Sequence, residues 1–287
     1  MSKISDSLNH KNIVCPFCSL HCDDLEIDVH DNKLYVKSNV PVSCAYKYEK
    51  LNLPKFKNMV TTVKGKPCEP KKAYQYSKQL IKKSKETVLL NSSSDVNVTR
   101  EVLSTASKVN AIVDHVNSSI FLKNISSYQR RGYMATSLTE IKNKSDVIIV
   151  FSNNLFKTYP RLMEKFLATK NSFSVNSKKK EIYVIGNKKN NIKDCNIRDK
   201  RITYVDYNNR NITKLLNSFI SKKNESSISN KVFNKLLTSI ETSKYLSVLW
   251  ATSEFDSYKE CDEIIYNISA YIVSLNKTSR AACLSLS

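Results

Sequence analysis

Glycine is the residue that this sequence most clearly lacks, with only Gly65, Gly132 and Gly186 among 287 residues. Loops that wrap around phosphate groups need glycine, because it lets the backbone approach a phosphate closely and adopt otherwise strained dihedral angles. Neither G-x-G-x-x-G nor the P-loop pattern occurs anywhere in the chain. The sequence therefore disfavours a standard nucleotide-binding or dinucleotide-binding loop.

Long apolar segments are absent as well. No stretch reaches the roughly 18 consecutive apolar residues that suggest a membrane-spanning helix. The opening residues, Met1 to Asp6, contain no apolar core of a signal peptide. We therefore expect a cytoplasmic protein with no membrane partner. Eight cysteines without a secretory signal favour free thiols or metal ligands over disulfides.

Negative charge is in short supply, since 46 Lys and Arg face 26 Asp and Glu and give a formal net charge of +20. Such an excess of positive charge is typical of proteins that bind nucleic acid. However, lysine greatly outnumbers arginine. The planar guanidinium group of arginine forms paired hydrogen bonds with phosphates and bases, which lysine cannot do. The lysines are also spread over the whole chain. The sequence therefore disfavours nucleic acid as a partner, although the charge can assist docking to acidic surfaces.

Cysteine, by contrast, is concentrated near the N-terminus. Cys15, Cys18 and Cys22 lie within eight residues, and Cys44 follows, which gives the spacing C-x2-C-x3-C-x21-C. Thiolates this close in one loop can converge on one soft metal centre. Four of them satisfy either one [4Fe-4S] cluster or one tetrahedral zinc ion. These four cysteines are the predicted metal ligands.

The spacing favours the cluster over zinc. Structural zinc sites usually contain two separated ligand pairs, whereas here Cys44 stands alone. Zinc stays open as the less favoured metal, because His21 could serve as a ligand. A redox-active C-x-x-C pair normally opens a helix, but Cys22 is followed by the strand-like alternation of residues 23–29. The redox interpretation is therefore disfavoured.

The rest of the chain separates into two parts. Residues 25–36 alternate in polarity around Asp31-Asn32, which predicts a β-hairpin that returns the chain toward Cys44. Residues 1–12 are polar, and we expect them to be frayed. We predict a Cys-rich β subdomain over residues 1–60 and an α/β domain over 61–287. Cys68 lies outside the metal spacing, and Cys261 and Cys283 are predicted to be buried structural thiols.

Beyond residue 70, short apolar runs alternate with helical patterns. The expected strands are 87–90, 111–113, 146–151, 181–185, 202–204, 246–250 and 281–286. The expected helices are 71–84, 96–109, 158–169, 209–221, 229–243 and 257–274. Short apolar strands separated by helices predict a doubly wound, mostly parallel α/β sheet with helices on both faces.

Three segments resemble one family. Cys15-Pro-Phe-Cys18-Ser-Leu-His-Cys22 resembles the opening of the B subunit of formylmethanofuran dehydrogenase and of its counterpart in the bacterial formyltransferase/hydrolase complex. Residues 139–154 with Tyr159-Pro-Arg161, and residues 275–282, are similar to two further segments of that family. The family belongs to the molybdopterin oxidoreductases. The resemblance thus implies their layout of a cluster loop, a small β unit and α/β layers.

Departures from the family are equally informative. The dehydrogenases ligate the pterin metal with a cysteine, but the corresponding residues 114–126 contain neither cysteine nor glycine. His115 is the remaining candidate, and a packed or surface histidine is the simpler interpretation. The resemblance therefore implies that molybdopterin or tungstopterin has been lost and that no catalytic residue is present. We also expect that the chain is C-terminally truncated relative to the family.

Together these features imply a noncatalytic B-type subunit that works with the A, C and D subunits of a formyltransferase/hydrolase complex in tetrahydromethanopterin- and methanofuran-linked one-carbon metabolism. One alternative is a catalytic pterin-dependent subunit that oxidises formylmethanofuran or reduces carbon dioxide. Another is a metal-bearing module that binds nucleic acid or a protein. Whether the chain is itself an enzyme stays open at this point.

Overall fold

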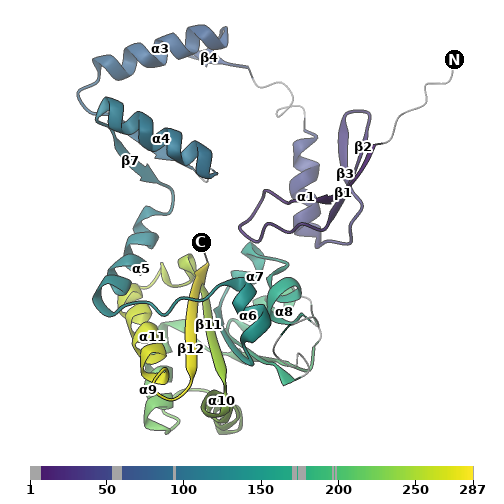
Figure 1. The fold of residues 1–287 in the computed structure, drawn as a ribbon, viewed down its shortest axis with the longest axis vertical. Coiled ribbons are helices and arrows are strands. Elements are labelled where there is room, and N and C mark those ends of the chain that lie inside the picture. The colour runs from purple at the N-terminus through teal and green to yellow at the C-terminus, as the bar shows by residue number, and fades with distance from the viewer. Residues whose placement is uncertain are drawn as a thin grey trace, which may run out of the picture. The chain divides into compact units, whose positions relative to one another are not determined.

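The structure, a computed structural model, describes residues 8–53, 60–92, 95–169, 173, 179–195, 197 and 199–286. Two compact units divide the chain. Residues 1–48 together with 122–287 form the first, called the main unit, and residues 49–121 form the second, called the insert unit. The predicted domains, 1–60 and 61–287, stay a prediction. Figure 1 labels many, though not all, of the elements of the two units.

A five-stranded parallel sheet forms the centre of the main unit, with the strand order β10-β9-β8-β11-β12. Its strands are β8 (Val147–Ser152), β9 (Glu181–Gly186), β10 (Ile202–Asp206), β11 (Tyr245–Ala251) and β12 (Arg280–Leu286). Each coincides with a predicted apolar run. The doubly wound, mostly parallel α/β fold class is thereby confirmed.

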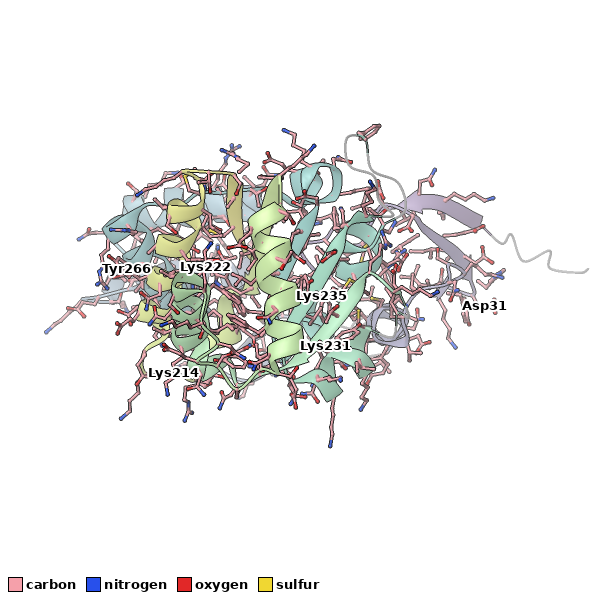
Figure 2. The ribbon with its side chains drawn as sticks, turned by 90° about the horizontal axis from the view of Figure 1, so that it is seen from below. Asp31, Lys214, Lys222, Lys231, Lys235 and Tyr266 are labelled. Atoms are coloured by element: carbon pink, nitrogen blue, oxygen red, sulfur yellow. The ribbon has the colours of Figure 1, made fainter. Side chains whose placement is uncertain are left out.

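Helices and short helical turns connect these strands. They are α5 (Ser118–Arg131), α6 (Leu138–Lys144), α7 (Leu155–Thr158), η1 (Met163–Leu167), α8 (Lys188–Cys195), η3 (Asn209–Asn211), α9 (Ile212–Ser221), α10 (Asn230–Thr242), η4 (Thr252–Phe255) and α11 (Cys261–Leu275). The lysines of α9 and α10 lie on the outer surface, as Lys214, Lys231 and Lys235 show in Figure 2. None of the described helices is long and apolar enough to cross a bilayer.

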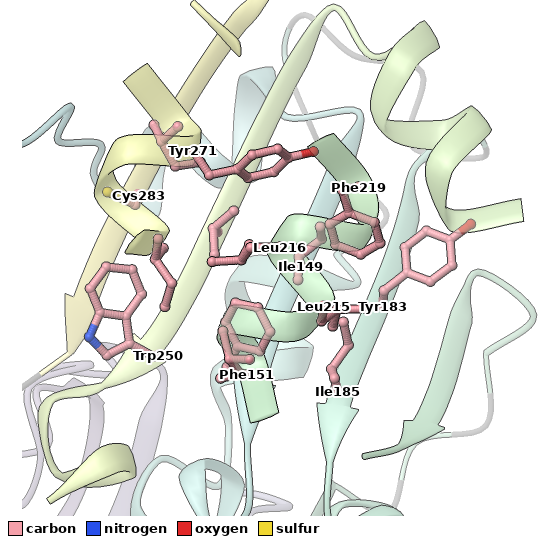
Figure 3. Packing of buried hydrophobic residues seen from close by; sticks show 14 of the residues in the cluster. Ile149, Phe151, Tyr183, Ile185, Leu215, Leu216, Phe219, Trp250, Tyr271 and Cys283 are labelled. Carbon is pink, nitrogen blue, oxygen red and sulfur yellow. The ribbon is translucent and has the colours of Figure 1, made fainter. Parts of the chain in front are cut away.

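The sheet buries both of its faces, because successive residues of a strand point to opposite sides. On one side Ile149 and Phe151 pack with Tyr183 and with residues of α9, α10 and α11 (Figure 3). On the other side Ile148 and Val150 belong to a core that also includes residues of α7, η1 and the N-terminal cysteine segment. Cys261 and Cys283 are fully buried, as predicted.

A small antiparallel sheet, with the order β1-β2-β3, carries the cysteine segment. It consists of β1 (Leu8–Ile13), β2 (Leu25–His30) and β3 (Lys33–Val36). Asp31 and Asn32 both have positive φ, 50° and 58°, as the tight turn of a two-residue hairpin requires. The predicted hairpin is therefore confirmed. The expectation of a frayed N-terminus is wrong for residues 8–12, which belong to β1 and its pairing with β2, while residues 1–7 lie outside the described residues.

Two local predictions need correction. The helix expected over 158–169 is instead the short α7 followed by the π-helical turn η1, because Pro160 cannot donate a helical hydrogen bond. The helix α1 (Val42–Leu51), which carries Cys44, was not predicted. It begins just after Pro41, whose carbonyl accepts a hydrogen bond from the Cys44 amide at 2.8 Å.

The insert unit contains β4 (Thr62–Val63), β5 (Lys66–Pro67), α3 (Pro70–Lys83), β6 (Val88–Asn91), α4 (Val96–Val109) and β7 (Ile112–His115). β6 and β7 form a two-stranded parallel sheet. The Asp95 side chain caps α4 by accepting a hydrogen bond from the Val98 amide at 2.9 Å. The strand expected over residues 87–90 forms as β6. The expectation that helices cover both faces of its sheet is wrong here, because Val88 and Leu90 are 61% and 63% exposed.

Candidate metal centre

The cysteine loop is a closed turn between β1 and β2. The Cys15 amide donates to the Cys22 carbonyl at 2.8 Å, and the His21 amide donates to the Cys18 carbonyl at 3.2 Å. His21 has a φ of 43°, a left-handed conformation that tightens the turn. These hydrogen bonds hold the first three cysteines in one loop.

All four predicted ligands line a single small cavity. Cys15, Cys18 and Cys22 enter from the loop, and Cys44 enters from the first turn of α1. The cavity has a volume of about 20 Å³. Its other lining residues are Leu20, Leu25, Val40, Tyr48, Pro160 and Arg161. The exposed His21 does not line it, so the structure offers no support for His21 as a ligand.

The arrangement of the four thiols around this cavity bears on the kind of metal centre that they could hold. Within the described ranges, no three His, Cys, Asp or Glu side chains are placed to hold one metal ion. A tetrahedral zinc ion would draw its sulfur ligands to within about 3.8 Å of one another, given Zn–S bonds of about 2.3 Å. A cubic cluster presents four separate corners and so requires a more widely spaced set of sulfurs.

Burial and charge both act on the thiols. Burial raises the pKa of the Cys22 thiol, and the nearby Arg161 guanidinium partly opposes this increase. Burial also raises the pKa of the Cys44 thiol, and Cys18 and Cys15 add to that increase. Metal ligation requires thiolates. The site therefore needs a compensating positive charge to hold four deprotonated sulfurs together.

Arg161 connects the cysteine loop to the α/β body. Its guanidinium donates two hydrogen bonds of 2.7 Å to the Asp24 carboxylate and two, of 2.8 and 3.3 Å, to the Glu164 carboxylate. Lys165 adds an ion pair with Asp24 at 2.6 Å. These contacts hold the pKa of Asp24 well below its usual range, chiefly through the hydrogen bonds from Arg161. The Tyr159-Pro-Arg161 motif therefore has a structural role that spacing alone could not reveal.

The Tyr48 hydroxyl is a buried polar group that lacks a partner at this site. The side chain is 4% exposed, and its oxygen has no hydrogen-bond partner among the described residues. The Cys15 thiol is a close neighbour without the geometry of a formed hydrogen bond. Buried hydroxyls are normally paired, so this one fits a site in which a deprotonated or metal-bound sulfur accepts its proton.

A second, larger cavity lies at the carboxyl ends of β8 and β11. From β8 the chain runs outward to β9 and β10, whereas β11 and β12 lie on the other side of β8. In doubly wound sheets such a reversal of direction creates a crevice for ligands. Here a pocket of about 270 Å³ is lined by Asn153, Asn154, Leu155, Thr158, Ala251, Ser253, Glu254, Asp256 and Ser257.

Acidic and neutral polar groups line this second cavity. The Glu254 carboxylate accepts hydrogen bonds from the Asn153 amide and, at 3.0 Å, from the Asn209 side chain. Burial raises the pKa of Glu254 to about 7. Asp256 forms an ion pair with Lys123 at 3.2 Å. The lining contains two carboxyl groups and no basic side chain, which makes it a poor receptor for a polyphosphate.

Comparisons with known proteins agree with the layout of this fold. Over 170 residues the chain is 25% identical to the B subunit of the tungsten-containing formylmethanofuran dehydrogenase 2 of Methanococcus maripaludis. Over 167 residues it is 27% identical to the protein of the same name from Methanocaldococcus jannaschii. Each match covers 54% of this chain and 37% of the relative, so the chain spans well under half the length of these curated relatives. No protein-family model matches the chain.

A solved structure shares the fold. A chain in the crystal structure of the formyltransferase/hydrolase complex from Methylorubrum extorquens, determined in complex with methylofuran, superposes with a TM-score of 0.60. The sequences are 18% identical, and the match covers 79% of this chain and 60% of that chain. At this level of identity the likeness establishes the common architecture.

Proposed function

Because the chain belongs to the family of formylmethanofuran dehydrogenase B subunits, we propose that it is a noncatalytic B-type subunit of a formyltransferase/hydrolase complex. It takes part in one-carbon metabolism linked to tetrahydromethanopterin and methanofuran, and it works in the cytoplasm. Its partners are the A, C and D subunits. The formyl group is transferred and hydrolysed on those partners, while this chain supports the assembly.

The observation that carries the noncatalytic role is the composition of residues 114–126. This region contains no cysteine to ligate a pterin metal. His115 is exposed at the end of β7, where its ring packs edge-on against Phe121 at 5.8 Å. The cavity between β8 and β11 adds support, because its lining offers no basic side chain to the phosphates of a pterin dinucleotide.

We propose that the four cysteines hold a [4Fe-4S] cluster with a structural role, with zinc as the less favoured alternative. Four thiols that line one cavity, and a buried Tyr48 hydroxyl with no hydrogen-bond partner among the described residues, suit such a centre. When bound, the cluster would supply four iron–thiolate bonds that link the loop to α1. Cys15 and Cys22 already belong to a hydrophobic core that includes residues of the α/β body. The iron–thiolate bonds would therefore help to hold the small sheet against that body.

The structural role of the cluster can be tested with Cys15→Ser and a matched control, Cys68→Ser, which changes a thiol in the insert unit outside the site. We expect Cys15→Ser to lose iron and to accelerate hydrogen exchange in residues 8–48, while Cys68→Ser behaves like the parent. Equal exchange rates in the two variants would contradict a stabilising role of the cluster.

The proposed subunit role is tested by co-expressing the chain with the A, C and D subunits. We expect a stoichiometric complex whose yield falls when this chain is omitted. The purified complex should transfer and hydrolyse formyl groups without oxidising formylmethanofuran when an electron-accepting dye is supplied. Dye-dependent oxidation that requires this chain would contradict the noncatalytic role.

A catalytic, pterin-dependent subunit is the second candidate, because the curated relatives are named as tungsten-containing. Stoichiometric tungsten or molybdenum in the purified chain would favour it. A nucleic-acid role receives less support. The positive charge of the helical surface, where Figure 2 labels Lys222 and Lys235, is partly paired. Lys222 forms an ion pair with Glu241 at 2.6 Å, and the Lys235 ammonium group lies over the Tyr183 ring.

A further inference from the structure

Tyr48 lies beside the four cysteines but belongs to none of the predicted site residues. It follows Cys44 by four positions on α1, so the two side chains lie on the same face of the helix. Its ring packs edge-on against Phe17 at 4.7 Å, which fixes its orientation toward the loop. Only 4% of its surface is exposed. The side chain is therefore buried and packed at the cavity wall.

Its hydroxyl has few possible acceptors. Besides the cysteines, the side chains that line the cavity are apolar except for Arg161. A guanidinium group donates hydrogen bonds and accepts none. Arg161 is in addition committed to Asp24 and Glu164. Among the described residues that line the cavity, cysteine sulfur is thus the only side-chain acceptor available to Tyr48, and Cys15 is the thiol most closely associated with it.

A neutral thiol is a weak acceptor, whereas a metal-bound thiolate is a strong one. This difference explains why the hydroxyl lacks a partner in the protein chain alone. Hydrogen bonds to the sulfurs of an iron–sulfur cluster withdraw electron density from the centre. They thereby make its reduction potential more positive.

We propose that Tyr48 is a positioning residue of the metal centre, which donates a hydrogen bond from its hydroxyl to the Cys15 sulfur of a bound [4Fe-4S] cluster and makes the reduction potential of that cluster more positive. This inference rests on the proposed cluster. It assigns to α1 two functions one turn apart, a ligand at Cys44 and a hydrogen-bond donor at Tyr48.

The test uses the full chain, reconstituted anaerobically with iron and sulfide, as the parent, Tyr48→Phe and Tyr46→Phe. Tyr46 lies on the same helix and is 53% exposed, so its substitution controls for the loss of a phenol from α1. We expect equal iron content in all three proteins. The midpoint potential, followed by electron paramagnetic resonance, should be more negative in Tyr48→Phe only.

The outcomes separate this inference from the proposal beneath it. If the parent takes up four irons and Tyr48→Phe has the parental potential, the hydrogen bond is refuted and the cluster stands. If the parent takes up no iron, both are refuted. If Tyr48→Phe alone fails to retain iron, site-specific replacement of Tyr48 by 3-fluorotyrosine tests whether the hydroxyl donates a hydrogen bond to the cluster. Its more acidic hydroxyl should shift the potential in the positive direction, and an unchanged potential would overturn the proposal.

Discussion

Two parallel sheets in this chain have opposite surroundings. In the main unit, every residue of β8 and β11 is buried, and helical segments and loops cover both faces of the sheet. In the insert unit, all four residues of β7 are exposed, and no residue of β6 is fully buried. A groove of about 730 Å³ opens along β6 and α4, lined in part by Val88, Leu90 and Val98.

This difference shows where the stability of the chain resides. Parallel strands normally occur with both faces covered, and a two-stranded sheet has little stability of its own. The main unit meets this requirement with its own residues. The insert unit leaves apolar strand faces open in the described structure. Substitutions in the two units should therefore differ sharply in their cost.

The largest difference is expected between two glycines. A Cβ atom at Gly186 would lie 2.0 Å from the Ser152 carbonyl oxygen, between β9 and β8, whereas at Gly65 no atom lies within 4 Å. Gly186→Ala should cost about 4 kcal/mol, because the two strands must separate. Gly65→Ala should cost about 1 kcal/mol, because its φ of 76° strains a side chain. Urea denaturation measures both, and equal costs would contradict the comparison.

Two leucines give the next largest contrast. Leu249 on β11 is fully buried, and Leu90 on β6 is 63% exposed. Leu249→Ala should reduce the free energy of unfolding by about 3 kcal/mol, through lost burial and a cavity. The matched change Leu90→Ala should cost less than about 0.5 kcal/mol. If Leu90→Ala proves as costly as Leu249→Ala, some covering of β6 exists in solution.

A smaller effect concerns pH. The pKa of Glu254 is raised by burial from 4.5 to about 7, so the folded chain binds its proton more tightly than the unfolded chain. Ionisation of Glu254 therefore lowers the free energy of unfolding. This loss is absent below pH 4.5, grows as the pH rises, and is complete above about pH 7. Glu254→Gln should therefore be more stable than the parent at about pH 8, by about 2 kcal/mol after allowance for partial exposure.

The control for that experiment is Glu101→Gln, on the exposed surface of α4. It should leave the pH dependence of the unfolding free energy unchanged between about pH 4 and pH 8. If Glu254→Gln follows the parental curve as closely as Glu101→Gln does, then Glu254 is not a desolvated carboxyl group. The cavity between β8 and β11 would then be open to water.

The sequence predicted those features that depend on local pattern. The apolar runs of 146–151 and 246–250 became central strands, and Asp31-Asn32 became a hairpin turn. The convergence of the four cysteines on one cavity was also foreseeable, because three of them share a loop. Cys44 reaches the cavity from α1, a helix that was not predicted because its sequence is polar. β1 was also not predicted, because its residues are polar and it is formed through pairing with β2.

Features that depend on long-range packing could not be read from the sequence. The run 87–90 has the composition of a buried strand, and only its surroundings make it exposed. Arg161 reaches Asp24 across 137 positions of the chain, a contact that no local pattern encodes. Tyr48 likewise becomes notable only once its hydroxyl is seen to be buried beside four sulfurs.

Elemental analysis of the anaerobically purified chain, co-expressed with the proposed A, C and D subunits, tests the central claim most directly. A structural cluster in a subunit without redox chemistry predicts close to four irons per chain, with neither molybdenum nor tungsten. A stoichiometric content of either pterin metal would contradict that claim and would make this chain the redox subunit itself.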